Sequence, residues 1–447
     1  MHNRNQKLTM INHNAAGIDI GSREHYVCVP ADRDKKNVQK FGAFTRDLKN
    51  LAVWLKGCGV TTIAMESTGV YWIPVFQILE SSGFEVILVN AKQIKNVPGR
   101  KTDVKDCEWI QRVHSYGLLS GSFRPDDQTC KLRALVRQRD RLIKSGTIHI
   151  NRMQKALNEM NIQLHHVISD ITGVTGMSII KAIIDGERDA QKLAEFRNNN
   201  IKSDTKTIVK ALEGDYREEL LFVLKQELES YEFYLNKIKE CDRAIEECLK
   251  EFDKRGDAEL KNKKPTKTKN APDFDLKQSL YDTTGIELTI VPGLGELSIQ
   301  TIISEVGLDM SKWKSEKHFT SWLGLSPNNK ITGGKVFNTR TRKVNNKASN
   351  AFRMAALNLA RGRSALAGFY RRIRGRAGAP KAITATARKL ACMFYRLLKY
   401  GQDYVEQGIE AYEKKYNETM VKNLKKHAAR LGFEGVCPID CVNSHKL

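Results

Sequence analysis

The sequence predicts a multidomain protein of the α/β plus α class, with a mixed-sheet domain near the N-terminus and helical regions after it. Its 447 residues exceed what one hydrophobic core of ordinary size accommodates. Strand and helix patterns alternate in the first part of the chain, whereas helical patterns dominate from about residue 126 onward. Residues 317–402 contain 19 Lys and Arg and neither Asp nor Glu, which predicts a separate basic domain.

Residues 14–125 are expected to form a mixed sheet with helices packed against it. The apolar pattern indicates three strands in a meander and then alternating helices and strands, a succession typical of a mixed sheet. The strands are expected at residues 17–21, 25–30, 38–44, 61–65 and 85–90, and the helices at 48–55, at 72–81 and from 102 onward.

Residues 126–253 are expected to form a helical, coiled-coil dimerisation region. Apolar residues recur at spacings of three and four over residues 221–252, which predicts one long helix with an apolar seam. A less regular repeat over residues 132–160 predicts either its antiparallel partner or a contact with a second copy of the chain. We expect a homo-oligomer, a dimer or a tetramer, with a helical bundle inside one subunit as the alternative.

The rest of the chain divides into a Lys-rich linker (254–282), a mostly helical basic domain (283–410) and a C-terminal tail (411–447). Near the start of the basic domain, Gly293 and Gly295 suggest a helix-hairpin-helix-like segment. Backbone N–H groups at such a turn can bind a phosphate, so both glycines are candidate nucleic-acid-binding residues.

The net charge of the chain favours a polyanionic partner. A formal charge of +23 at pH 7 is typical of proteins that bind nucleic acid. No apolar run is long enough to span a bilayer, so no membrane partner is expected. The first ten residues are polar and lack the apolar core of a signal peptide, so a cytoplasmic, nucleoid-associated location is expected.

Four carboxylates are candidate metal ligands and catalytic residues. Asp19 lies within a short apolar strand, and Glu66 ends the next buried strand. An acidic residue in such a position is costly to bury unless it is paired or binds a metal. Asp103 and Asp106 are three residues apart at a helix start, although Asp103 as a helix cap and Asp106 as a surface residue are alternatives. Together they offer oxygen ligands suited to Mg²⁺, and two such ions could act on a phosphodiester.

These motifs resemble the DEDD transposases of insertion-sequence family one-ten, also called bridge-RNA-guided recombinases. The resemblance extends from about residue 14 to residue 400. The matching segments are GIDIGS (17–22), MESTGVYW (65–72), KTDVKD (101–106), VPG (291–293), WLGL (322–325) and ITGGK (331–335).

The resemblance implies a RuvC-like domain with the RNase H fold, a coiled-coil dimerisation region and a C-terminal transposase domain. It implies an enzyme of bacteria or archaea that cuts and exchanges the DNA strands of a mobile element, guided by a structured RNA. Two alternatives use the same residues differently. A junction-resolving endonuclease would use the carboxylates without a hydroxyl nucleophile, and an inactive relative would only bind nucleic acid.

The resemblance also implies a hydroxyl nucleophile in the basic domain. The family has a Ser where this chain has Thr332, and the extra methyl group of Thr restricts its side chain. A turn residue that contacts phosphate is the alternative role for Thr332, and Ser326 is the alternative nucleophile. The cations that would bind nucleic acid around the scissile phosphate are Lys335, Arg340, Arg342 and Lys343.

Overall fold

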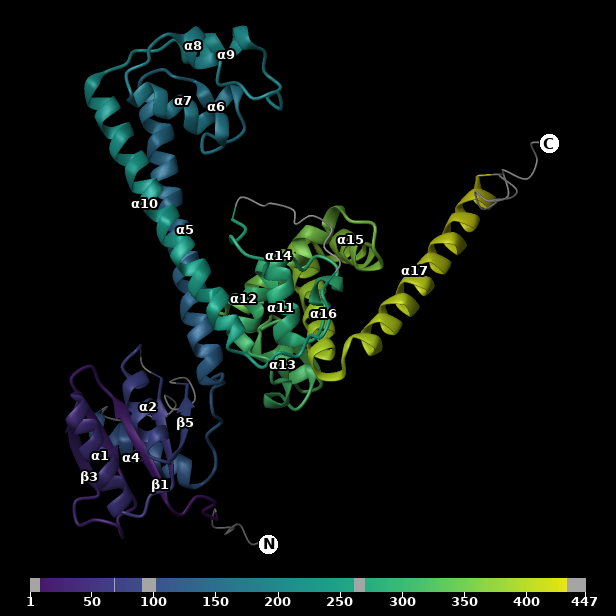
Figure 1. Cartoon of the computed structure of the whole chain (residues 1–447). Helices are drawn as coiled ribbons and strands as arrows, with labels where there is room; N and C mark the ends of the chain where they lie inside the picture. The colour runs from purple at the N-terminus through teal and green to yellow at the C-terminus, as the bar shows by residue number, and fades with distance from the viewer. Residues whose placement is uncertain (1–8, 68, 91–101, 261–269, 432–447) are drawn as a thin grey trace. The chain divides into compact units, whose positions relative to one another are not determined.

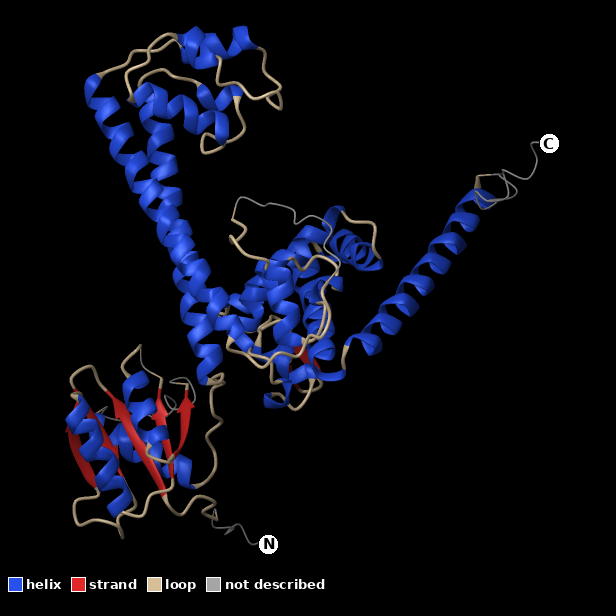
Figure 2. Ribbon diagram, viewed as in Figure 1, coloured by secondary structure: helices blue, strands red, loops and turns tan. Residues whose placement is uncertain are grey.

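The computed structural model describes residues 9–67, 69–90, 102–260 and 270–431, without the side chains of 402–412 and 415. The chain divides into two compact units, Met1–Arg124 and Pro125–Leu447. Figure 1 shows the course of the chain and Figure 2 its helices and strands. Within the described ranges, no helix is long and apolar enough to cross a membrane.

The N-terminal unit contains a five-stranded mixed sheet with the strand order β3-β2-β1-β4-β5. β1 pairs antiparallel with β2 and parallel with β4. β3 extends the antiparallel side and β5 the parallel side. The strands are β1 (Ala15–Ile20), β2 (Glu24–Cys28), β3 (Val38–Gly42), β4 (Thr62–Glu66) and β5 (Glu85–Val89), and the helices are α1 (Thr45–Gly57), α2 (Trp72–Ser81) and α4 (Asp103–Ser115).

The order of these elements agrees with the RNase H-like mixed sheet that the sequence predicts. Each predicted strand and helix is present within a few residues of its expected bounds. Helices cover both faces of the sheet (Figure 2). On one face, Ile18 and Ile63 pack with Leu51 of α1 and Leu79 of α2. On the other face, Ala64 and Val89 pack with Ile110 of α4.

The C-terminal unit begins with two long helices that pack along each other, α5 (Asp127–Glu159) and α10 (Glu218–Lys250) (Figure 1). They are antiparallel, since Lys131 near the start of α5 pairs with Glu251 just beyond the end of α10. His149 near the end of α5 pairs with Glu227 near the start of α10. The predicted antiparallel partner of the seam therefore belongs to the same chain. Contact of this region with a second chain stays a prediction.

The seam between these helices is less uniform than the apolar repeat suggests. Leu228 and Ile245 are buried in it, but Leu235 is 36% exposed. Between Leu235 and Ile245 along α10, Asp242 forms a buried ion pair with Arg139 of α5. Burial raises the pKa of Asp242 against the opposing effect of Arg139. The ion pair interrupts the apolar seam. A shift of one helix along the other would leave Arg139 and Asp242 buried without their partners, which is costly, so the pair favours this register.

Four short helices lie between α5 and α10 along the chain and share one core with the adjoining ends of both. Ile179, Ile180 and Ile183 of α7 are fully buried against Leu157 of α5 and Leu224 of α10. The short helices are α6 (Leu164–Val167), α7 (Val174–Ile184), α8 (Ala190–Ala194) and α9 (Thr205–Leu212).

The basic domain is mostly helical, as the sequence predicts. Its core is aromatic, because Phe352 of α14 lies against Phe319 of α13 and Phe394 of α16, with ring centroids 6.5 and 5.6 Å away. The elements are α11 (Leu276–Thr284), η1 (Leu288–Ile290), α12 (Glu296–Val306), η2 (Met310–Lys312), α13 (Glu316–Trp322), β6 (Lys330–Thr332), β7 (Lys335–Asn338), α14 (Lys347–Asn358), η3 (Leu359–Arg361), α15 (Ala365–Ala377), α16 (Ala379–Tyr400) and α17 (Gln402–Arg430).

Two expectations about irregular segments need correction. The linker was expected to reach residue 282, but α11 begins at Leu276, because Leu276 and Leu280 are buried on one helix face and Asp275 caps the helix. The tail was expected from residue 411, but α17 continues to Arg430. The predicted residues 261–269 of the linker and 432–447 of the tail lie outside the described part of the chain.

Candidate active site

Two of the four candidate carboxylates occupy equivalent positions on neighbouring strands. The parallel pairing of β1 and β4 places Ile18 opposite Met65. Asp19 and Glu66 are the next residue on each strand, and both are half-buried. They lie toward the C-terminal ends of a parallel strand pair, which is where sheets of this type commonly bind ligands.

Both side chains extend from the face of the sheet that α4 covers. Gly17 of β1 contacts α4, and Asp19 follows it by two residues, so the two share a face. A Cβ atom on Gly17 would lie 2.5 Å from the carbonyl oxygen of Cys107 and would also collide with the backbone of Gln111. Only glycine therefore allows α4 to approach β1 this closely. On β4, Glu66 bears the same two-residue relation to Ala64, which packs against α4.

The other two candidate carboxylates lie in the first turns of α4. Thr102 caps this helix, because its Oγ1 accepts a hydrogen bond from the backbone N–H of Lys105 at 3.3 Å. The capping role held as an alternative for Asp103 thus belongs to Thr102. Asp103 is exposed, whereas Asp106 is half-buried and precedes Cys107, which contacts β1.

The electrostatics of Cys107 connect α4 with Asp19. A hydrogen bond with Cys28 of β2 raises the pKa of the Cys107 thiol most, and burial adds to this effect. The negative charges of Glu108 and Asp19 raise the pKa further, so Cys107 stays a neutral thiol at neutral pH. The Asp19 carboxylate is therefore near enough to α4 to influence its side chains.

The predicted gathering of all four carboxylates around a metal is not present as a compact group in these residues. Among the side chains that the structure describes, no three His, Cys, Asp or Glu lie close enough to hold a metal ion. Residues 91–101, which connect β5 with α4, lie outside the described part. The metal site of Asp19, Glu66, Asp103 and Asp106 therefore stays a prediction.

The candidate nucleophile lies on a β-hairpin in the C-terminal unit. Thr332 ends β6 and pairs with Lys335 of β7. Gly333 and Gly334 between them have φ angles of 55° and 76°, so the turn needs two residues in the left-handed region. Thr332 and Lys335 are both exposed, which leaves the Thr332 hydroxyl accessible to a polymer substrate.

Three large apolar side chains on this hairpin face solvent. Ile331 is 62% exposed, Val336 55% and Phe337 82%. A hairpin that combines exposed apolar residues with lysines is typical of a surface that becomes covered by a partner.

Other candidates from the sequence have structural contacts. Arg342 donates hydrogen bonds to the carbonyl oxygens of Ser321 and Trp322 at the end of α13, at 3.1 and 3.5 Å. The hydroxyl of Ser326 lies 2.9 Å from the hydroxyl of the buried Thr320. These contacts favour positioning roles for Arg342 and Ser326 over direct action on a phosphate.

The glycine turn before α12 is closely packed. Gly293 has a φ of 87°, and a Cβ atom there would lie 2.7 Å from the carbonyl oxygen of Ala355. Gly295 is exposed and caps α12, but Glu296 follows it directly. Burial raises the pKa of Glu296, and Asp275 raises it further. When this carboxyl is charged it disfavours a phosphate at this helix end, so phosphate binding by the two glycines stays a prediction.

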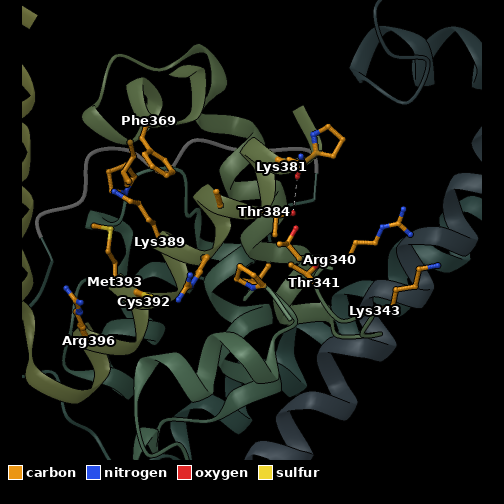
Figure 3. Close-up of a pocket in the computed structure, with 18 of the residues that line it drawn as sticks. Arg340, Thr341, Lys343, Phe369, Lys381, Thr384, Lys389, Cys392, Met393 and Arg396 are labelled. Atoms are coloured by element: carbon orange, nitrogen blue, oxygen red, sulfur yellow. Dashed lines mark hydrogen bonds between the residues drawn. The ribbon is translucent and has the colours of Figure 1, made fainter. Parts of the chain in front are cut away.

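A cavity of about 1280 Å³ opens in the basic domain at the base of the hairpin. Figure 3 shows that its cationic side chains come from the segment after β7 and from α16. They are Arg340, Lys343, Lys381, Arg388, Lys389 and Arg396. Glu413 is the acidic residue among those that line it. Such an excess of positive charge fits a polyanionic ligand.

Two family models match the chain. Residues 16–162 match the DEDD transposase model of the IS110 type, and residues 287–371 match the model of the IS116/IS110/IS902 transposase family. The chain is an IS110-family DEDD transposase. It is therefore a DNA transposase or recombinase. A search of curated proteins found no match.

The candidate site residues of this transposase are distributed over the two matched segments. The first contains Asp19, Glu66, Asp103 and Asp106, and the second contains the hairpin with Thr332. DEDD transposases generally use divalent metal ions. The second match ends at residue 371, so the cations that α16 contributes to the transposase cavity lie beyond it.

Sequence reasoning missed the cations of α16 as individual site residues. The absence of acidic residues from 317–402 indicated a basic surface but did not distinguish one lysine or arginine from another. A usable signal exists, because Arg388 and Lys389 follow Lys381 by seven and eight residues on α16, which places both about two turns further along the helix on the same side as Lys381.

Proposed function

We propose that this transposase cuts and exchanges the DNA strands of a mobile insertion sequence with a Mg²⁺-binding tetrad and a hydroxyl nucleophile. The observation that carries the proposal is the position of Asp19 and Glu66. They lie on neighbouring inner strands, toward the C-terminal ends of both, on the face covered by the helix that carries Asp103 and Asp106. A structure-specific, junction-resolving endonuclease would lack the nucleophile's covalent product, so that product separates the two functions.

The donor set fits Mg²⁺, because all four side chains offer carboxylate oxygens, which are the ligands that hard cations prefer. Asp19 and Glu66 would bind from the strands, Asp106 from the half-buried side of α4 and Asp103 from its exposed first turn. Bound Mg²⁺, as two ions in our proposal, would stabilise the negative charge that develops on the phosphate.

Thr332 supplies the hydroxyl in the proposed reaction. Its oxygen forms a bond to phosphorus while the bond between phosphorus and the departing strand breaks, and the departing oxygen takes up a proton. The Thr332 proton passes to solvent, and the product is a phosphothreonine ester that joins protein and DNA. A hydroxyl group of a second strand then attacks the ester and releases Thr332, which completes strand exchange.

Cations near the hairpin would hold the scissile phosphate. Lys335 is exposed opposite Thr332, and Arg340 and Lys343 line the cavity at the hairpin's base. Their positive charges would attract the phosphate and offset charge in the transition state.

Guidance by a structured RNA and assembly of a homo-oligomer are further parts of the proposal. The charge of +23 supports binding of more than one nucleic-acid strand. Exposed apolar residues on the long helices support contact between subunits, among them Phe222 and Phe233, which are 62% and 55% exposed.

A covalent-adduct assay tests the proposal. The purified chain is incubated with Mg²⁺, with DNA that spans the end of the element and with RNA transcribed from the element, and the products are separated after denaturation. We expect a protein–DNA adduct with the parent and with Thr332→Ser, and none with Thr332→Val, which keeps the side-chain shape but lacks the oxygen. Cleaved DNA without any adduct, at equal rates in the parent and Thr332→Val, would instead indicate a junction-resolving endonuclease.

A further inference from the structure

The cavity in the basic domain carries more positive charge than its surroundings neutralise. In the described part of the chain, the side-chain nitrogens of Arg340, Lys343, Lys381 and Arg388 have no ion-pair partner. Arg388 is half-buried, so its charge is held partly away from water. Leaving a half-buried guanidinium unpaired is costly, which indicates that an anion neutralises it in the functional state.

The other cations of the cavity are already engaged. Arg396 forms a two-point ion pair with Glu316, at 2.6 and 2.9 Å. The ammonium of Lys389 lies 4.2 Å from the ring centroid of Phe369. These contacts fix two cations at the wall, and the unpaired ones remain to bind a ligand.

Between the cations, the cavity is lined with apolar side chains. Leu325, Leu366, Pro380, Ala385 and Met393 contribute to this lining. A ligand that fits needs apolar faces as well as repeated negative charges. Single-stranded nucleic acid has both, because its bases are free to turn toward an apolar surface while its phosphates contact Lys and Arg. A duplex keeps its bases stacked inside and presents phosphates on a convex surface, so it cannot fill a cavity of this kind.

The cavity adjoins the hairpin that carries Thr332. Pro327 and Thr341, which precede and follow the hairpin, form an isolated β-bridge and also line the cavity. The N–H of Asn328 donates to the carbonyl oxygen of Arg340 at 3.2 Å. The base of the hairpin thus forms one wall of the cavity. A nucleic-acid strand that is bound in the cavity can therefore continue along the hairpin to Thr332.

We propose that this cavity binds single-stranded DNA beside the phosphate that Thr332 attacks, with phosphates at the unpaired cations and bases against the apolar lining. The inference rests on the proposed function, because the assignment to DNA follows from the role of Thr332. It adds residues of α16 that neither family match includes. It follows from the proposal that the two DNA strands separate next to the cleavage point.

Equilibrium binding of the full chain to labelled oligonucleotides tests this proposal by fluorescence anisotropy. The probes are one single-stranded DNA, its duplex and the RNA of the same sequence, each measured over a range of salt concentrations. Arg388→Ala removes a half-buried charge, Lys381→Ala removes an exposed one, and Ala385→Phe fills the apolar lining without changing charge. Arg376→Ala is the matched control, since Arg376 is exposed on α15 and does not line the cavity.

We expect Arg388→Ala and Lys381→Ala to weaken single-strand binding and to reduce the slope of log affinity against log salt by about 0.7 each. Ala385→Phe should weaken single-strand binding about tenfold, the order associated with loss of one stacked base, with the slope unchanged. Duplex binding should change by less than about twofold in all three variants, and Arg376→Ala should behave as the parent does. Circular dichroism shows whether Ala385→Phe folds. If it does not, the result with Lys381→Ala decides the test.

Equal losses for single strand and duplex would overturn the proposal, as would unchanged single-strand binding by Arg388→Ala and Lys381→Ala. Tighter binding of RNA than of DNA, with the same sensitivity to the variants, would reject DNA as the ligand. These measurements need no cleavage. A chain that binds single-stranded DNA as expected but never forms an adduct would show that the proposed nucleophile is wrong, whereas the binding of single-stranded DNA in the cavity would stand.

Discussion

Gly17 determines how closely the helix with two candidate ligands approaches the strand with a third. A side chain at this position would collide with the backbone of α4 at Cys107 and Gln111. Any larger residue would therefore push α4 away from β1 and would separate Asp106 from Asp19. The effect of Gly17 on the site is geometric, since the residue has no group that binds a metal or a substrate.

At the same scale, Asp106→Asn tests the proposed tetrad. The change removes a ligand charge with little change in volume, so folding and DNA binding should be nearly unaffected. DNA cleavage in Mg²⁺ should fall by about a hundredfold or more, the order seen when an active site loses one electrostatic stabiliser. Glu108→Gln is the matched control, because Glu108 is an exposed carboxylate on the same helix. Undiminished cleavage by purified Asp106→Asn would remove Asp106 from the proposed site.

At the scale of elements, α4 is attached to the sheet by a buried polar contact as well as by apolar packing. His114 near the end of α4 is 4% exposed, and its Nε2 lies 3.0 Å from the hydroxyl of Thr62 on β4. Burial lowers the pKa of His114 below its usual value of 6.5. The neutral ring is therefore the form that the folded protein favours.

This shift predicts a pH dependence of stability. Because the folded-state pKa of His114 is lowered, the unfolded chain binds more protons as pH falls below about 6.5. The contribution of the neutral His114 to the free energy of unfolding is fully present above the pKa of His114 in the unfolded chain. It is lost as pH falls toward the lower pKa of His114 in the folded protein. Thermal unfolding of the parent should therefore depend more steeply on pH in this range than that of His114→Gln. His13→Gln, at an exposed position, is the control and should follow the parent. Parallel curves for the parent and His114→Gln would contradict the assignment.

At the scale of the whole molecule, the proposed chemistry needs residues from both compact units. The carboxylates belong to residues 1–124, whereas Thr332 and the cavity belong to residues 125–447. The two long helices of the second unit expose apolar side chains, including Ile148, Phe222 and Phe233. A transposase in which one subunit supplies carboxylates to the nucleophile of another would remain inactive until it assembled on nucleic acid.

Complementation between two inactive variants tests this arrangement. Asp106→Asn and Thr332→Val should each fail to form a covalent DNA adduct. Mixed before assembly, they should recover part of the parental activity, because some sites would then combine an intact tetrad with an intact Thr332. Light scattering with nucleic acid present establishes whether mixed oligomers form. Mixed oligomers without recovered activity would show that each site uses one chain only.

Local sequence patterns were enough to predict the elements of the N-terminal unit and the two long helices after it. The strand and helix order of the N-terminal unit follows from apolar residues that alternate or recur every three to four positions, and such patterns depend on near neighbours in sequence. The strand pairing of β6 and β7, the cap at Asp275 and the extent of α17 were not predicted. Each depends on a few residues whose signal is weak beside the apolar repeats.

The sequence alone determined the class of fold, the excess of positive charge, the four acidic candidates and the likeness to a transposase family. These properties reside in composition, in short motifs and in local periodicity. Only the tertiary structure decided that Asp19 and Glu66 share the face covered by α4, and that Arg342 contacts α13. It also brought the segment after β7 together with α16 around one cavity. Side chains far apart in sequence meet only when elements pack, and packing is decided by the whole core at once.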